Sequence, residues 1–312
     1  MAPRTTKPAG ALQEVGFGDL RDLIPSWERS LRAANKSPRT IRGYGDDARL
    51  FATFLAEKGM PTAVEKLTRE HVETFIEDQL ARHKPTTAAV RYRSLQQLFK
   101  WLLEEREIPS SPMAQMRPPA VPEVPVPVVS DDDLRKLLGT CTTNEFDDRR
   151  DHALLRLMID TGMRLSEVAG IKLEDVEFGS DVIVVLGKGR RIRAVPFGPK
   201  TARALDRYLR ARARHRHAAD PALWLGTQGA LGTSGITQVL RRRCEQAKIE
   251  EIHPHQLRHT AAHAWLAAGG EEGDAMRIFG WKSREMLARY GAARADDRAR
   301  EAFRRLLPGD RL

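Results

Sequence analysis

The chain has 312 residues, a formal net charge of +10 and a sequence pI near 9.9. This length accommodates two ordinary domains, and a strongly basic balance favours a polyanionic partner such as nucleic acid. No apolar run approaches the roughly 20 residues of a membrane span, no secretory leader is evident, and the two cysteines form no disulfide framework, so we expect a cytoplasmic protein.

Four helical patterns precede residue 108. Apolar residues recur at spacings of three and four, and Ser37 followed by Pro38 is a typical helix start. The predicted helices cover about 17–31, 37–55, 68–80 and 86–105. They predict a small helical bundle over residues 17–107, after a flexible N-terminus at 1–16.

Basic side chains of this bundle cluster at helix starts and loops, where phosphates bind readily. Solvated surface charge explains any single one of them about equally well. The candidate DNA-binding residues are Arg39, Arg42, Arg82, Lys84, Arg91 and Arg93.

A Pro-rich stretch over residues 108–129 predicts an extended linker that lies outside any core. Beyond it we expect a second domain at 130–291, with helices starting at Ser130 and at about Arg149. The segment DVIVVLGKGRRIRAVPF alternates β-branched residues around a Gly-Lys-Gly turn, which predicts a β-hairpin. The remainder is expected to be helical, so the predicted fold is mainly α with a small antiparallel sheet.

Two motifs carry cations suited to phosphate chemistry. In TGMRLSEVAG, the planar fork of Arg164 matches two phosphate oxygens, and Glu167 lies one helical turn further on, placed to orient it. An isolated pair of this kind is more often an ordinary surface ion pair. In LGKGRRIRAVP, Lys188 occupies the hairpin turn, where a lysine is usually just solvated; the spacing of a phosphate-binding P-loop is absent.

A third motif, HPHQLRHTAAHAW, places His255 and Arg258 one helical turn apart, so both can face one phosphate. His259 and His263 lie four residues apart on the same predicted helix, which raises the alternative of a metal site. The glutamate of HExxH is missing and no acidic cluster lies nearby, so we expect no metal and assign His259 to local packing.

The last motif, FGWKSREMLARYG, contains Trp281 and Tyr290. An indole N–H is a single donor able to bond a phosphate oxygen, whereas a plain core role is the competing interpretation for Trp281. A tyrosine hydroxyl is a nucleophile, and the other three tyrosines lie outside any such motif, so Tyr290 is the candidate attacking group.

In this order, the four motifs resemble the catalytic domain of the tyrosine recombinases, the phage-integrase family, from about residue 130 onward. The N-terminal bundle resembles the SAM-like core-binding domain of the same family. Trp281 departs from the histidine that is commonest at its position, although some members carry tryptophan there. The resemblance implies six catalytic residues: Arg164, Lys188, His255, Arg258, Trp281 and Tyr290.

The resemblance also implies their roles. Tyr290 attacks the scissile phosphate, and Lys188 protonates the leaving 5′ oxygen. Arg258 clamps the non-bridging oxygens, while His255 holds the phosphate and accepts the tyrosine proton.

The implied activity is site-specific recombination of double-stranded DNA at paired sites, without ATP, cofactor or metal. Four protomers act through a Holliday junction at the nucleoid, and an accessory or directionality protein is a further candidate partner. Residues 292–312 predict a tail helix that either folds back or docks into a neighbouring protomer. We expect no additional arm-binding domain. The alternatives are a type IB topoisomerase-like enzyme and a non-catalytic DNA-binding protein.

Overall fold

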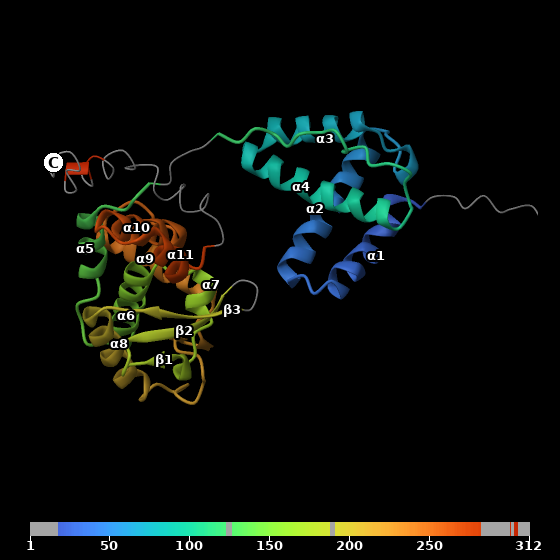
Figure 1. The fold of residues 1–312 in the computed structure, drawn as a ribbon. Helices are drawn as coiled ribbons and strands as arrows, with labels where there is room; N and C mark the ends of the chain where they lie inside the picture. Colours follow the sequence, from blue (N-terminus) through green and yellow to red (C-terminus); the bar gives the residue numbers. More distant parts are fainter. Residues whose placement is uncertain (1–17, 123–126, 188–190, 282–299, 301–302, 305–312) are drawn as a thin grey trace, which may run out of the picture. The chain divides into compact units, whose positions relative to one another are not determined.

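The computed structural model describes residues 18–122, 127–187, 191–281, 300 and 303–304. The chain divides into two compact units, unit 1 (Met1–Glu123) and unit 2 (Val124–Leu312), which we describe separately (Figure 1). Within these described ranges, no helix is both long enough and apolar enough to cross a membrane.

Unit 1 is a helical bundle. Ser37 starts one of its helices as predicted, because its hydroxyl accepts a hydrogen bond from the Thr40 amide and Pro38 occupies the first turn. The core gathers around Phe51, whose ring meets Phe75 edge to face at 5.1 Å between centroids. The helices described are α1 (Leu20–Ala33), α2 (Pro38–Glu57), the 3₁₀ turn η1 (Val64–Lys66), α3 (Arg69–Arg82) and α4 (Pro85–Glu104).

The segment after α4 corrects one expectation. It was predicted to stay outside any core, yet Ile108 and Met113 are each 3% exposed and belong to the core of unit 1. Burying an aliphatic side chain of this size stabilises the fold by about 1.5–3 kcal/mol, so the first part of the Pro-rich stretch packs onto the bundle.

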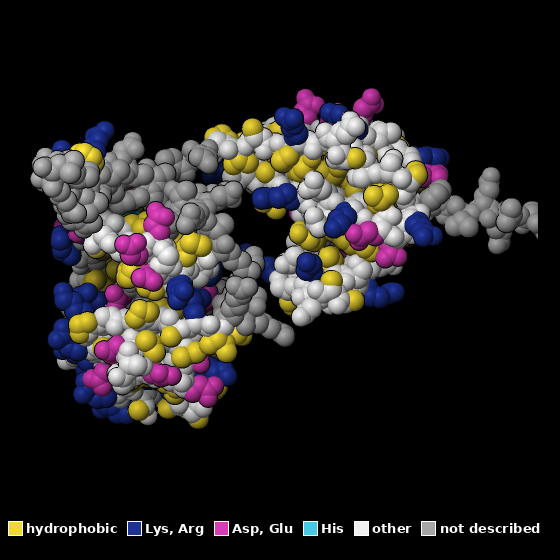
Figure 2. Space-filling view, viewed as in Figure 1, with side chains coloured by type: hydrophobic (Ala, Val, Ile, Leu, Met, Phe, Trp, Pro, Cys, Tyr) yellow, Lys and Arg dark blue, Asp and Glu magenta, His cyan; other side chains and the backbone are white. Residues whose placement is uncertain are grey.

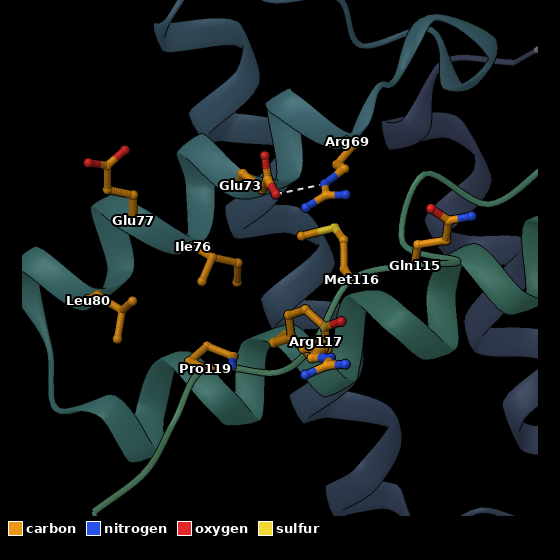
Figure 3. A pocket seen from close by; sticks show the side chains of 10 residues that line it. Arg69, Glu73, Ile76, Glu77, Leu80, Gln115, Met116, Arg117 and Pro119 are labelled. Atoms are coloured by element: carbon orange, nitrogen blue, oxygen red, sulfur yellow. Dashed lines mark hydrogen bonds and ion pairs between the residues drawn. The ribbon is translucent and has the colours of Figure 1, made fainter.

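A hollow separates the next part of this segment, residues 115–119, from α3 (Figure 3). Ile76 and Met116 contribute apolar side chains to it. The ion pair between Arg69 and Glu73, at 2.7 Å, lies at its border. The segment therefore runs beside α3 as it leaves the bundle.

Unit 2 is mainly helical and has two small antiparallel sheets (Figure 1). Its elements are α5 (Asp131–Gly139), α6 (Phe146–Thr161), α7 (Leu165–Ala169), η2 (Leu173–Asp175), β1 (Val176–Glu177), β2 (Val182–Gly187), β3 (Arg191–Pro196), α8 (Pro199–Arg212), β4 (Leu225–Gly226), β5 (Gly229–Ala230), α9 (Thr233–Ala247), α10 (Pro254–Ala267) and α11 (Glu272–Phe279). The predicted fold class, mainly α with a small antiparallel sheet, is confirmed.

The predicted hairpin is β2 and β3, and β1 extends it to a three-stranded sheet. Ile183 lies opposite Val195 in the register, and both are fully buried, as a period of two requires for the inner face. The expectation that the remainder is helical was wrong for β4 and β5. Strands of two residues are too short to leave a periodic pattern in the sequence.

Helix α6 runs through the core of unit 2 and leads to the candidate site. It begins at Phe146, three residues before the predicted start at Arg149, and it ends at Gly162 as predicted. Gly162 has φ +55°, and a Cβ there would lie 2.9 Å from the Cβ of Ala261 on α10. Only glycine combines this left-handed turn with such a close approach of α10.

Candidate active site

Arg164 follows the α6 terminus and caps the short helix α7. Its Nη1 donates to Oε1 of Glu167 at 2.9 Å, and its backbone amide donates to Oε2 at 2.9 Å. Its Nη2 donates to the carbonyl of Gly280, also at 2.9 Å. The Arg164 side chain is 28% exposed, so these contacts fix the plane of its guanidinium while part of the side chain still faces solvent.

Glu167 is the centre of this arrangement and is only 4% exposed. Besides Arg164, it binds Arg193 of β3, whose Nη1 and Nη2 donate to Oε1 and Oε2 at 2.9 and 2.8 Å. Burial by itself would raise the pKa of the carboxyl, but the hydrogen bonds and positive charges of the two arginines lower it to about 2. Glu167 is therefore a carboxylate at neutral pH, and two guanidinium groups share it.

Arg258 lies on the first turns of α10 and is 2% exposed. Its Nη1 donates to the carbonyl of Gly162 at 2.7 Å, and its Nη2 donates to the carbonyl of Phe279. Its Cζ also stands 5.5 Å from the centroid of the Trp281 ring, within the range of a cation–π contact. Arg258 thus joins the ends of α6 and α11.

The last turn of α11 receives an arginine on each of three consecutive carbonyls. Ile278 accepts from Nε of Arg193 at 3.0 Å, Phe279 accepts from Arg258, and Gly280 accepts from Arg164. The terminal carbonyls of a helix lack intrahelical partners and carry partial negative charge, so they suit guanidinium donors. This single turn brings together three arginines that are far apart in the sequence.

Gly280 makes this convergence sterically feasible. Its φ is +63°, and a Cβ there would lie 3.2 Å from Cζ of Arg193 and 3.4 Å from Nη1 of Arg164. The glycine in the FGW motif is explained by this close approach of two guanidinium groups.

Trp281 is 5% exposed and packs in a small cluster with residues of α10 and α11. Its ring stacks on Phe279 at 4.9 Å between centroids. The structure therefore places the indole beside Arg258 and, at the same time, within packed apolar surroundings.

His255 and His259, one turn apart on α10, form an edge-to-face pair at 4.6 Å between ring centroids. Partial burial, followed by the charges of Arg258 and Arg164, lowers the pKa of His255. Burial together with His255 lowers the pKa of His259 to about 4. Both imidazoles are therefore neutral at pH 7, and His259, at 6% exposure, lies inside the domain as expected.

Two predicted site residues, Lys188 and Tyr290, lie outside the described residues. The flanking structure on each side is described. The strands of the predicted hairpin end at Gly187 and begin at Arg191, and β3 is tied to Glu167 and Ile278 through Arg193. On the side of Tyr290, the described residues end at Trp281. The predicted tail helix also lies largely outside the described residues.

The candidate DNA-binding residues of unit 1 belong to α2, α3 and α4 or their borders. Arg91 differs from the others because it is only 18% exposed, donates to Gln79 and lies 3.8 Å from Asp47. The positive charge of Arg91 is therefore partly neutralised by Asp47 within the bundle. Arg82 is exposed and forms an ion pair with the partly buried Asp78. The remaining exposed positions are Arg39, Arg42, Lys84 and Arg93.

Arg193 is a site residue that the motif analysis missed. In the register of the sheet it lies opposite buried Val185, two residues before buried Val195. Counting back by two from Val195 would have placed it on the inner face of the hairpin, where a charged side chain needs a partner. The alternation of buried and exposed residues along the strand was therefore the sequence signal that could have identified Arg193.

Comparison with known proteins agrees with this geometry. Residues 127–296 match the phage integrase family, and residues 23–108 match the phage integrase N-terminal SAM-like domain. The first match spans more than half of the chain. The chain belongs to the phage integrase family.

Two curated relatives of this integrase-family chain are named tyrosine recombinase XerC. That of Oceanobacillus iheyensis is 30% identical over 88% of this chain and 92% of its own length. That of Corynebacterium efficiens is also 30% identical, over 97% of this chain and 99% of its own. The predicted family and the predicted class of enzyme, a tyrosine-type site-specific DNA strand transferase, are confirmed.

Solved structures share the fold. The XerH site-specific recombinase bound to palindromic difH substrate superposes with a TM-score of 0.72, covering 91% of this chain and 84% of XerH at 16% identity. A lambda integrase tetramer bound to a Holliday junction gives a TM-score of 0.69, covering 88% of this chain and 78% of that one at 17% identity. At such identities the likeness concerns the fold.

Proposed function

We propose that Tyr290 of this integrase-family enzyme attacks the scissile phosphate of a DNA strand and forms a 3′-phosphotyrosyl bond, releasing a 5′-hydroxyl. The 5′-hydroxyl of a partner strand then displaces the tyrosine. The observation that carries the proposal is the convergence of Arg164, Arg193 and Arg258 on the last turn of α11. That turn directly precedes Trp281 and the segment leading to the nucleophile.

The arginines supply the charge stabilisation. Negative charge grows on the non-bridging oxygens as the phosphorus becomes five-coordinate, and a guanidinium remains protonated at any working pH. Arg164 and Arg258 are fixed beforehand by carbonyl and carboxylate acceptors, so little reorganisation is needed when the phosphate arrives. In this proposal they bind the phosphate, and Trp281 adds one N–H donor beside them.

Proton transfer falls to a histidine and a lysine. The lowered pKa of His255 keeps its imidazole neutral, and a neutral imidazole can accept the proton of the Tyr290 hydroxyl. Lys188, in the turn between β2 and β3, would protonate the leaving 5′ oxygen. One phosphodiester replaces another of similar energy, so the exchange is balanced without ATP.

Glu167 and Arg193 act through the other residues. The carboxylate holds the Arg164 fork, and Arg193 ties the hairpin strand of Lys188 to the same carboxylate and to α11. We assign both as positioning residues, with His259 supporting the ring of His255 through its edge-to-face contact.

At the level of domains, residues 17–107 would bind DNA as the core-binding domain and residues 130–291 would form the catalytic domain. The substrate would be double-stranded DNA with paired recombination sites, which places the enzyme at the nucleoid. Two rounds of exchange need four nucleophiles, so we propose a tetramer on two sites with a Holliday junction between the rounds.

A plasmid with two directly repeated copies of the native site tests this function. Recombination should yield two circles, require both sites and proceed in EDTA. Relaxation of a plasmid with one site or none, without strand exchange between sites, would instead identify a topoisomerase-like enzyme. Site binding without any covalent intermediate would identify a non-catalytic DNA-binding protein.

A further inference from the structure

A second basic surface lies on unit 2, along α6 and α8. On α8, cations recur at spacings of three, four and three residues: Lys200, Arg203, Arg207 and Arg210. Side chains at these spacings share one face of a helix, and over ten residues this face extends about 15 Å. All four residues are exposed.

Helix α6 adds a parallel row of basic residues. Arg149, His152 and Arg156 follow one another at spacings of three and four. Arg149 and His152 line the same hollow as Arg207 and Arg210, so the two rows lie side by side. We call the combined surface the α6–α8 face, defined by these residues and by Lys200 and Arg203.

The acidic groups near this face are already engaged. Asp206 pairs with Arg210 at 2.5 Å, and Asp148 accepts from Arg243 at 2.7 Å. Asp160 accepts from the Gly198 amide and the Thr201 hydroxyl, neutral donors that leave its charge in place at the start of α8. Among the described residues, Lys200, Arg203 and Arg207 have no acidic partner within ion-pair distance.

Two further observations indicate an uncompensated positive field. Burial, then the charges of Arg156 and Arg207, lowers the pKa of His152. Nε of Arg156 is buried and has no acceptor among the described residues. Burial is the largest cause of this lowered pKa, and the smaller contribution of the two arginines reflects a positive potential that also attracts anions.

The α6–α8 face extends away from the candidate active site, from Lys200 near the end of α6 to Arg149 near its start. Arg149 lies near the start of α6, whereas Arg164 follows its end, which puts about 20 Å of helix between them. Helix α8 lies at the opposite edge of unit 2 from α7 (Figure 1). Figure 2 shows Lys and Arg gathered along that edge.

We propose that the α6–α8 face binds the phosphate backbone of a duplex DNA segment other than the one held at the active site. A row of cations at regular spacing, interrupted only by Asp206 beside Arg210, suits a polymer whose charges repeat, since about 15 Å of helix spans roughly four phosphates of one strand. The proposal rests on the DNA-acting function for the identity of this polyanion. The face therefore provides contact with DNA outside the cleaved site.

The test compares two triple variants of the full-length protein on a random-sequence 40-base-pair duplex. The first variant carries Lys200→Gln, Arg203→Gln and Arg207→Gln. The control carries Lys136→Gln, Lys172→Gln and Arg241→Gln, which remove the same charge from exposed cations that already pair with acidic neighbours. Because all six positions are exposed, circular dichroism should show both variants folded.

The measurement is the slope of log binding constant against log salt concentration. Loss of three phosphate contacts should reduce the slope by about 2–3 in the first variant, and by less than about 1 in the control. Equal reductions in both variants would overturn the proposal, because net charge alone would explain them.

A second arm repeats the comparison in an Arg164→Gln background. If the three substitutions reduce the salt-dependence slope equally in that background, the α6–α8 face and the active site bind different phosphates. If the slope is no longer reduced in the Arg164→Gln background, the α6–α8 face is part of the active-site interface and the proposal is overturned. If polyglutamate binding weakens in the first variant while DNA binding does not, the partner is an acidic protein, and the proposal also fails. None of these slopes depends on DNA cleavage, so failure of the proposed recombination would appear separately, in the two-site plasmid.

Discussion

Glu167 and Arg193 form a two-point ion pair in which both carboxylate oxygens are bound, at 2.9 and 2.8 Å, by the two terminal nitrogens of the guanidinium. Through this pair the hairpin strand β3 is joined to the same carboxylate that orients Arg164. Arg193 also reaches the end of α11 through Ile278. One carboxylate therefore links three segments that each lead to a proposed catalytic group.

Arg193→Lys should reduce DNA cleavage by about tenfold or more while DNA binding is retained, because a lysine cannot make the two-point contact that fixes β3. A substrate with a 5′-bridging phosphorothiolate separates the causes, since a thiolate leaves without needing a proton. If Arg193 positions Lys188, this substrate should restore most of the rate, as it should for Lys188→Ala. Near-native cleavage of the ordinary substrate by Arg193→Lys would contradict the assignment.

Glu167 should make stability fall at acidic pH. Its folded pKa of about 2 lies below the ordinary value of 4.5, so its contribution is complete above about pH 4.5 and is lost as the pH falls towards 2. The shift corresponds to about 3 kcal/mol of unfolding free energy. Urea unfolding of wild type and Glu167→Gln between pH 5 and pH 2 should show a smaller decline in the variant. Equal declines would mean that Glu167 does not carry this dependence.

Gly280→Ala should destabilise the fold by on the order of 1–2 kcal/mol and slow cleavage, because the added Cβ meets both Arg193 and Arg164 in a left-handed backbone conformation. Gly273→Ala is the matched control on the same helix, since a Cβ there meets nothing within 4 Å. Thermal unfolding should leave the control unchanged or slightly more stable. Equal effects of the two substitutions would count against the steric argument.

On the acidic side of the pH profile, the rate of cleavage should fall only below the ordinary pKa range of histidine. Partial burial and the charges of Arg258 and Arg164 lower the pKa of His255, so the neutral, proton-accepting imidazole persists down to mildly acidic pH. A pH–rate profile of single-turnover cleavage should show this acidic limb in wild type and lose it in His255→Gln. A limb that persists in the variant would assign the titration to another group.

The motifs of the active site could be predicted from sequence because each is formed by residues close together in the chain. Arg164 and Glu167 lie within one helical turn of each other, as do His255 and Arg258. The convergence of the arginines on the carbonyls of α11 could not be predicted, because every residue has a backbone carbonyl and the sequence does not indicate which ones accept a side-chain donor. Arg193 was missed for a related reason, because its partner Glu167 is 26 residues away. The four-helix bundle and the hairpin followed from apolar periodicity, whereas the burial of Ile108 and Met113 did not, because two apolar residues among prolines form no periodic pattern.

Tyr290 is the proposed nucleophile, and trapping on a nicked suicide substrate built on the native site examines this role at the bond that it forms. Cleavage near the nick releases a short fragment, so any covalent protein–DNA adduct is trapped and visible after denaturing electrophoresis. Wild type should accumulate the adduct in the presence of EDTA, whereas Tyr290→Phe should bind the same DNA with unchanged affinity and form none, since only the phenolic oxygen is lost. Adduct formation by Tyr290→Phe at the wild-type level would show that Tyr290 is not the nucleophile.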